Sequence, residues 1–334
     1  MRKSNGKSSH QSRTAAATLT MLLAGTAMLS APAISQEYPT KPIRLIVPFA
    51  PGGGTDRVGR TMAAKMSQPL KQQVIVDNRP GAATVIGSEI VARAAPDGYT
   101  LLLCALPHAT NPSLLKNLPY DTLRDFAPIT LTAKIPSVLL VNAKIPAKSI
   151  KELVALSKST TAGLNYGTPG GGTAAHLATE LLKIASGLRA THIPYKGAGP
   201  QVTALVSGQI DLAFATISTA RTHVGTGRLR ALAIATLQKS PSLPEVPTLS
   251  ESGYPGFEAY AWFGLLAPAG TPPRIIQTLN REANAALNLP DVRASFEADG
   301  IDAAPGSSDA LDKHIRGEIE KWAKVIRQAG ITPE

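Results

Sequence analysis

The stretch IRLIVPFAPGGGT, residues 43–55, joins an apolar run to three consecutive glycines and a threonine. The pattern returns as LNYGTPGGGT at residues 164–173, and in both places the chain continues with the periodicity of an amphipathic helix. We call the two PGGGT motifs the first glycine corner (residues 51–55) and the second glycine corner (residues 169–173). They predict the same strand, glycine loop and helix in each half of the chain.

Such a corner has two interpretations. Glycines allow a tight turn, and they also let the backbone approach an anion at the positive N-terminus of the following helix. Two matching corners favour the second interpretation, with two domains presenting anion-binding edges to one cleft. Neither corner has the lysine of a phosphate-binding P-loop, and the chain has neither the GxGxxG dinucleotide motif nor the GxSxG nucleophile motif.

The rest of the chain alternates short apolar runs with amphipathic stretches, which predicts an α/β fold. Strands are predicted in the first half at residues 43–49, 72–78, 99–106, 126–133 and 137–143, and in the second half at 190–195, 210–216 and 229–236 besides the run before the second glycine corner. Helices are predicted at residues 55–70, 83–95, 150–159, 173–186, 273–287 and 308–329. A capping box opens the helix at 150–159, and Gly187 closes the helix at 173–186.

Residues 1–35 have the pattern of a secretory signal peptide. They begin with four basic residues and no acidic one, continue with an apolar stretch, and end in small residues. Cleavage after Ala33 and cleavage after Ser35 both fit this pattern. The alternative is a retained membrane anchor, but the apolar stretch is short and rich in Ala, Thr and Gly, whereas a spanning helix needs about 20 apolar residues.

Composition narrows the function further. The 334 residues carry a net charge of +11, yet aromatic residues make up 4% and no run of Lys and Arg occurs, so we expect no nucleic-acid partner. A mild preference for anionic small molecules fits better. Cys104 is the only cysteine, so no internal disulfide is possible, and it is predicted to be a buried thiol. Histidine and cysteine show no metal-ligand spacing, and we expect no metal and no cofactor.

Two side chains beside the corners have open roles. Asp56 is suited to bind an amine on a ligand, to orient a loop N–H group, or simply to occupy the first turn of a helix. His176 lies one turn into the second helix, on one face with Glu180, and is either a ligand contact or a structural histidine.

The chain resembles the periplasmic solute-binding proteins of tripartite tricarboxylate transporters, often called the Bug receptors. The resemblance runs through nearly the whole chain after the signal peptide, in the order of the family. It is carried by YPTKPIRLIVPFAPGGGTD, VIVDNRPGAATVIGSEIVARAAPDGYTLL, NPSLLKNLPYDTLRDFAPIT, YGTPGGGTAAHLATELL, HIPYKGAGPQVTALVSGQIDLAF, LPEVPTLSESGYPGFE and WFGLLAPAGTPP.

This resemblance implies a two-domain periplasmic binding protein fold of the Venus flytrap, type II-like kind, with a ligand cleft between the domains. Domain 1 would comprise residues 36–137 and 261–334, and domain 2 residues 138–260. It also implies a carboxylated ligand, held by loop N–H groups, hydroxyls and ordered waters. The implied ligand-binding residues are Phe49, Ala50, Gly53, Gly54, Thr55, Asp56, His108, Thr168, Gly172, Thr173, His176, Tyr195, Lys196 and Gly197.

Three functions follow as hypotheses. The first is a monomeric periplasmic receptor that delivers an organic acid to the membrane permease of a tripartite tricarboxylate-type transporter. The second is a ligand-dependent signalling partner of a sensor kinase. The third is an exported enzyme acting on a carboxylate, and against it stands the lack of any paired acid–base or nucleophile residues, so we expect no catalytic residue. The sequence does not distinguish dicarboxylates, tricarboxylates, aromatic acids and acidic amino acids as ligands.

Overall fold

A computed structural model describes Met1 and residues 38–331 of the 334-residue chain. The signal peptide predicted at residues 1–35 therefore lies, apart from Met1, outside the described residues. The chain divides into two units, Met1–Thr40 and Lys41–Glu334, and every helix and strand named below belongs to the second.

The elements alternate between strands and helices, as the sequence predicted. The strands are β1 (Ile43–Val47), β2 (Val74–Asn78), β3 (Thr100–Ala105), β4 (Phe126–Asn142), β5 (Leu164–Thr168), β6 (Ala190–Pro194), β7 (Leu212–Thr216), β8 (Leu229–Ile234), β9 (Tyr260–Pro268) and β10 (Asp302–Ala303). The helices are α2 (Gly54–Ser67), α3 (Val85–Ala92), α4 (Pro107–Leu114), α5 (Ile150–Ser159), α6 (Ala174–Ser186), α7 (Ala198–Ser207), α8 (Ile217–Val224), α9 (Pro273–Leu287), α10 (Pro290–Ala298) and α11 (Ser308–Gln328), with a 3-10 turn η1 (Ala82–Thr84) before α3.

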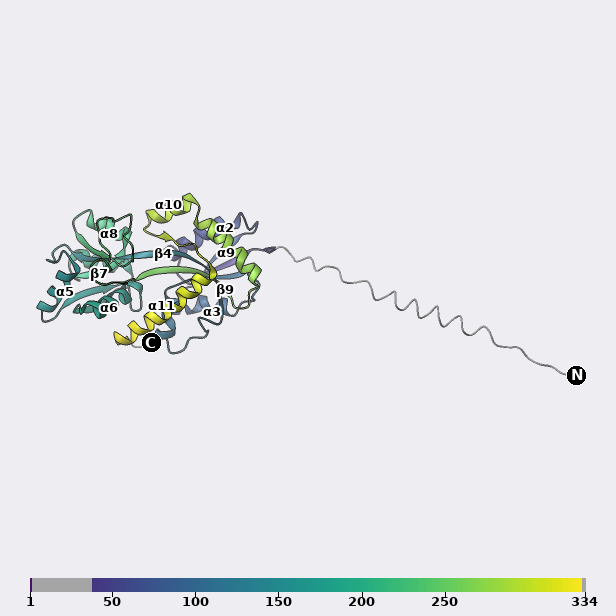
Figure 1. Ribbon diagram of the computed structural model, residues 1–334, viewed down its shortest axis with the longest axis horizontal. Helices are drawn as coiled ribbons and strands as arrows, with labels where there is room; N and C mark the ends of the chain where they lie inside the picture. The colour runs from purple at the N-terminus through teal and green to yellow at the C-terminus, as the bar shows by residue number, and fades with distance from the viewer. Residues whose placement is uncertain (2–37, 332–334) are drawn as a thin grey trace. The chain divides into compact units, whose positions relative to one another are not determined.

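One sheet connects the ten strands that residues 38–331 form. Its order is β2-β1-β3-β9-β4-β7-β5-β6, with β8 and β10 also pairing with β4. We call the strands β2, β1, β3 and β9 with residues 126–136 of β4 the first half of the sheet. We call residues 137–142 of β4 with β7, β8, β5 and β6 the second half. In Figure 1, β4 runs between the group of elements around β7, with α5, α6 and α8, and the group that holds α2, α3 and α9.

The long strand β4 replaces two predicted strands. Residues 126–133 and 137–143 were predicted as separate strands, and Pro136 lies between them. In the structure Pro136 still pairs with Tyr260 of β9, and from Ser137 onward the partner becomes β7. The other proline of the strand, Pro128, lies where the register against β9 shifts, the kind of irregularity at which strands accommodate proline.

The predicted helix ends of α5 and α6 are confirmed. The Ser149 hydroxyl accepts the N–H of Glu152, and the Glu152 carboxylate accepts the N–H of Lys148. Thr173 caps α6 in the same way, and Gly187 follows its last turn with a φ of 69°, in the left-handed region that favours glycine.

Apolar side chains from both halves of the sheet form the core. The larger cluster includes Cys104, which is 1% exposed, so the prediction of a buried thiol is confirmed. The indole of Trp262 fixes β9 to the C-terminal helix α11, because its Nε1–H donates to the buried Glu318 carboxylate of α11 at 3.0 Å. Trp322, within α11, donates to the same carboxylate at 2.8 Å. Within residues 38–331, no helix has both the length and the apolarity that crossing a membrane requires.

Candidate functional site

The strand directions bring the two glycine corners toward each other. Strands β3 and β4 are both antiparallel to β9, so they are parallel to one another, and β4 runs from the first half of the sheet into the second. Because β1 is parallel to β3, its carboxyl end points toward the second half. Strands β7 and β5 run the opposite way, since β7 is antiparallel to β4 and parallel to β5. The corners after β1 and β5 thus lie at the edges where α/β sheets bind ligands.

The first glycine corner ends in an open helix N-terminus. Gly53 is the N-cap of α2 and supplies no side-chain cap. The N–H groups of Gly54, Thr55 and Asp56 have no hydrogen-bond partner among the described residues, because the first bond of the helix runs from Arg57 to Gly53. Gly53 and Gly54 are exposed, as is Ala50 before them, whereas Thr55 is buried. The corner therefore presents backbone donors at the positive end of a helix.

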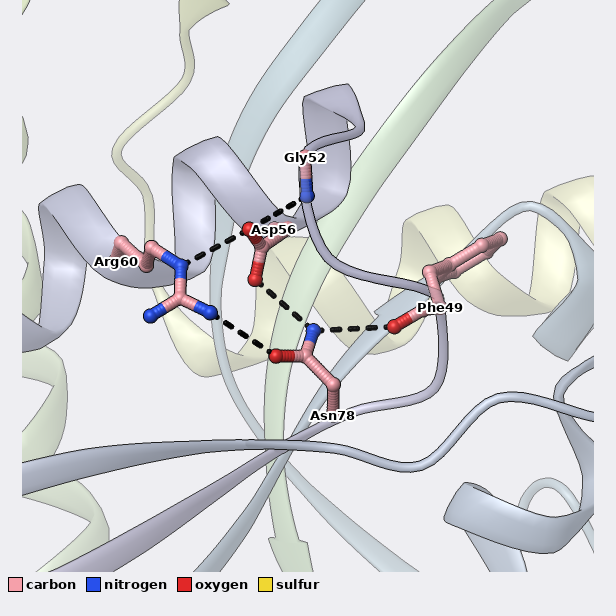
Figure 2. A network of polar contacts seen from close by, with 5 residues as sticks. All are labelled: Phe49, Gly52, Asp56, Arg60 and Asn78. Carbon is pink, nitrogen blue, oxygen red and sulfur yellow. Dashed lines mark hydrogen bonds and ion pairs between the residues drawn. The ribbon is translucent and has the colours of Figure 1, made fainter.

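The Asp56 carboxylate holds the loop of the first glycine corner through hydrogen bonds. Its Oδ2 accepts the Gly52 N–H and the Arg60 Nε–H, both at 2.9 Å, and its Oδ1 accepts the Asn78 Nδ2–H at 2.9 Å (Figure 2). Asn78 also donates to the carbonyl of Phe49, so the network connects both ends of the loop. Burial alone would raise the pKa of Asp56, but the hydrogen bonds from Arg60, Gly52 and Asn78 outweigh it and lower the pKa to about 2. Of the three roles open to Asp56, the geometry favours orienting the loop.

We expect Asp56→Asn to destabilise the protein by about 1 to 3 kcal/mol, because an amide cannot accept all the hydrogen bonds that the carboxylate accepts. Asp312→Asn is the matched control, since Asp312 also pairs with an arginine four residues on, Arg316, but in an exposed position. That control should change stability by less than about 0.5 kcal/mol. Urea unfolding at pH 7 measures both, and equal effects would contradict the anchoring role of Asp56.

The second glycine corner is built differently. The Thr173 hydroxyl caps α6 by accepting the His176 N–H, and it donates to the carbonyl of Gly170 at 2.8 Å. Gly172 has a φ of +67°, and its N–H donates to His176 Nδ1 at 3.0 Å. The N–H groups of Ala174 and Thr173 have no partner among the described residues. This corner also presents helix N–H donors, but its Thr173 hydroxyl already makes hydrogen bonds with Gly170 and His176.

The loop after β6 is joined to the second glycine corner. The Tyr195 N–H donates to the carbonyl of Thr168 at 2.9 Å, and the Gly197 N–H donates to the carbonyl of Pro169 at 3.1 Å. Lys196 between them is exposed and makes no hydrogen bond or ion pair with the residues that the structure describes. The structure therefore brings together the predicted residues of this half.

His108 packs among buried aromatic side chains. It lies in the first turn of α4 and is 1% exposed, packed edge-on against Phe126 and stacked with Tyr120. Neither ring nitrogen has a partner among the described residues. Burial lowers the pKa of His108 to about 4, and the backbone of Thr122 beside the ring offsets only part of this effect. Its predicted ligand contact stays a prediction.

The two corners also touch side chains of the central strand and of α4. A Cβ built on Gly54 would lie 3.5 Å from Cδ1 of Ile135 in β4, and one built on Gly172 would lie 3.0 Å from Cδ1 of Leu114 in α4. Through this contact, the second glycine corner, in the second half of the chain, lies against a helix that follows β3 in the first half of the chain.

Sequence reasoning missed the side chains that support the corners. Arg60 could have been found from its spacing, four residues after Asp56 on a helix. His192 could have been found only from the pairing of β6 with β5, which sets it opposite Tyr166. Its Nε2 lies 2.7 Å from Oγ1 of Thr168, beneath the second glycine corner.

The arrangement suits binding of an anion. Both corners offer backbone N–H groups at helix N-termini that have no partner within residues 38–331, and such groups stabilise negative charge. In the part of the chain from 38 to 331, no three His, Cys, Asp or Glu side chains gather where they could hold a metal ion.

Comparison with known proteins agrees with this geometry. Residues 58–331 match the family described as tripartite tricarboxylate transporter family receptor. The chain is 40% identical over 307 residues to protein BugT of Bordetella pertussis, covering 91% of this chain and 94% of that protein.

Three solved structures are similar as well, each with 34% identity and each covered over its whole length. Rhodopseudomonas palustris Rpa4515 with adipate has a TM-score of 0.77 over 89% of this chain, and the periplasmic binding protein BugD has 0.73 over 89%. MatC from Rhodopseudomonas palustris with bound malate has a TM-score of 0.72 over 86% of this chain. These neighbours confirm the predicted fold class, the α/β fold of a periplasmic binding protein.

Proposed function

Since the chain belongs to the tripartite tricarboxylate transporter receptor family, we propose that it is a periplasmic receptor that captures an organic acid and delivers it to a permease of that transporter type. The proposal includes export by the signal peptide of residues 1–35. It also includes a receptor role without catalysis, in keeping with a family of solute-binding receptors.

The observation that carries the proposal is the pair of opposed glycine corners. Each follows the carboxyl end of a parallel strand, and each offers helix N–H groups without partners among the described residues. A small molecule with a carboxylate at each end can accept hydrogen bonds from both corners, and burial between them strengthens each bond. Adipate, found with Rpa4515, and malate, bound to MatC, are both dicarboxylates. We therefore propose a dicarboxylate as the ligand class.

The proposed site keeps the domain division that the sequence predicted. Domain 1, residues 36–137 and 261–334, supplies the first glycine corner, and domain 2, residues 138–260, supplies the second. Closure of the two domains around the ligand would complete the site. The proposed contacts are Phe49, Ala50, Gly53, Gly54, Thr55, Asp56, His108, Thr168, Gly172, Thr173, His176, Tyr195, Lys196 and Gly197.

A thermal-shift screen of organic acids tests the proposal. A dicarboxylate at 100 times its Kd should stabilise the protein by about 2.7 kcal/mol and raise the Tm by several degrees. Aspartate and glutamate should give smaller shifts than malate and adipate, because the Asp56 carboxylate is already occupied by Gly52, Arg60 and Asn78 and cannot readily bind an amine. Neutral diamides of the same length serve as controls. A panel in which no acid raises the Tm would overturn the proposed function.

A further inference from the structure

Three aromatic rings from three elements stack beneath the second glycine corner. His176 of α6 lies on His192 of β6, with ring centroids 4.1 Å apart and planes 9° from parallel. Tyr166 of β5 continues the stack, 4.9 Å from His192 at 18°. We call these three residues the ring stack. Its top ring touches the corner directly, because the Gly172 N–H donates to Nδ1 of His176.

Hydrogen bonds connect both histidines of the ring stack to the second glycine corner. Nδ1 of His176 accepts from Gly172, so the proton of a neutral His176 is on Nε2. Nε2 of His192 lies 2.7 Å from the Thr168 hydroxyl oxygen, and the two groups share a hydrogen bond. The Thr168 hydroxyl also lies 3.0 Å from the carbonyl of Gly170, so His192 is connected to the loop of the corner.

The charges that face the ring stack balance one another. The Tyr166 hydroxyl donates to the carboxylate of Glu180, and Lys183 binds the same carboxylate at 2.8 Å. The Lys183 ammonium also lies over the Tyr166 ring, 5.4 Å from its centroid. Burial and then the neighbouring ring of His192 lower the pKa of His176 to about 4, and burial lowers the pKa of His192. The Glu180 carboxylate acts in the opposite direction on the pKa of both histidines, but burial, with the charge of Lys183, outweighs it.

We propose that His192 is a positioning residue of the second glycine corner, and that the corner keeps its binding shape only while the rings of His176 and His192 are neutral. A protonated His176 would set an Nδ1–H against the N–H of Gly172, so their hydrogen bond would break. His192 opposes this change, because its ring packs on His176 and its Nε2 hydrogen-bonds with the Thr168 hydroxyl at the end of β5. The ligand in this proposal rests on the proposed function, but the shape of the corner is a property of the free protein.

An NMR titration of ligand-free protein from pH 7.5 to pH 4 tests the free-protein part. The amide resonance of Gly172 should shift with the same midpoint as the ring of His176, well below pH 6.5. In His192→Gln the amide can still hydrogen-bond with Thr168, but the second ring, whose own protonation in acid opposes a charge on His176, is lost. We therefore expect the His176 midpoint to rise by about one pH unit. His314→Phe is the control, because burial lowers the pKa of His314 too, to about 4, in a distant aromatic cluster.

A binding titration with malate and adipate then tests the consequence. Between pH 7.5 and pH 5, the affinity of His192→Gln should fall about twofold more than that of the parent or of His314→Phe, because a His176 midpoint near 5 leaves half of the variant with a neutral ring at pH 5. A merely structural defect would lower affinity equally at every pH. Ionisation of the acids is common to all three proteins and cancels. If His192→Gln does not fold, His192→Phe keeps the stack and removes the hydrogen bond with Thr168.

The NMR titration tests the role of His192 in the free protein, and the binding titration tests the proposed ligand as well. If neither acid binds, the proposed function is in doubt and the NMR titration alone decides the role of His192. A Gly172 amide that stays still while His176 titrates, or a His176 midpoint unchanged in His192→Gln, overturns the inference.

Discussion

Replacing Gly54 with proline lowers the affinity for the dicarboxylate by roughly ten- to a hundredfold while the protein stays folded. One lost hydrogen bond to a charged group corresponds to about 1.5 to 3 kcal/mol. The fold tolerates the change because Gly54 is the first residue of α2, where proline is favoured, and Gly53 before it has the extended conformation that proline requires, with φ −82° and ψ 173°. Isothermal titration calorimetry with the best acid of the screen measures the loss.

The second glycine corner permits the same experiment at Ala174, the first residue of α6. Thr173 before it is also extended, with φ −71° and ψ 161°, so Ala174→Pro removes one N–H without moving the backbone. Gly54→Ala and Ala174→Ser are the matched controls, since they keep the N–H groups, and the added Cβ at Gly54 meets only an ordinary contact with Ile135. Unchanged affinity in both proline variants would mean that the corners are only turns.

Sequence analysis predicted helix bounds well where the amphipathic periodicity extended over several turns. The tail helix predicted at residues 273–287 has those bounds in α9, and the one predicted at 308–329 ends one residue earlier in α11. Both carry an amphipathic stripe over many turns, so neighbouring residues support the same prediction. The domain division at residues 137 and 260 stays a prediction.

Short or irregular elements were not predicted from the sequence. Helix α4 was missed because its eight residues include two prolines, one at its start and Pro112 inside it. The helix predicted from residue 83 begins only at Val85, because Ala82, Ala83 and Thr84 all have positive φ, between 45° and 78°. A side chain from elsewhere holds this strained turn, since Asn111 donates to the carbonyl of Ala83 at 2.8 Å. No local pattern reveals such a contact.

In the candidate site, too, local features were predicted and contacts between distant segments were not. Both glycine corners form the strand, loop and helix that their motifs predicted, because a loop between adjacent elements is a local feature. Their supports are contacts between distant segments: Asn78 reaches Asp56 from β2, and His192 reaches Thr168 from β6. Those contacts depend on strand order and register, which one sequence does not supply.

Acid should destabilise the protein through His108. The folded state holds the pKa of this histidine at about 4, whereas an unfolded chain has the ordinary value near 6.5. Below pH 6.5 the unfolded chain therefore binds more protons than the folded protein, and stability is lost as the pH falls from 6.5 toward 4. For a single group with these two pKa values the loss reaches about 2 kcal/mol at pH 5.

His108→Phe isolates this contribution, because phenylalanine has a similar shape, packs on Tyr120 and Phe126 and cannot be protonated. Between pH 7.5 and pH 5, urea unfolding should show the variant losing about 2 kcal/mol less than the parent. The variant still retains His176 and His314, whose pKa values burial also lowers, so some acid sensitivity remains. At pH 7.5 the variant should be at least as stable as the parent, since it removes buried ring nitrogens that have no partner among the described residues. Equal losses in parent and variant would show that His108 is hydrated or hydrogen-bonded in solution, and would leave it available as the ligand contact that the sequence predicted.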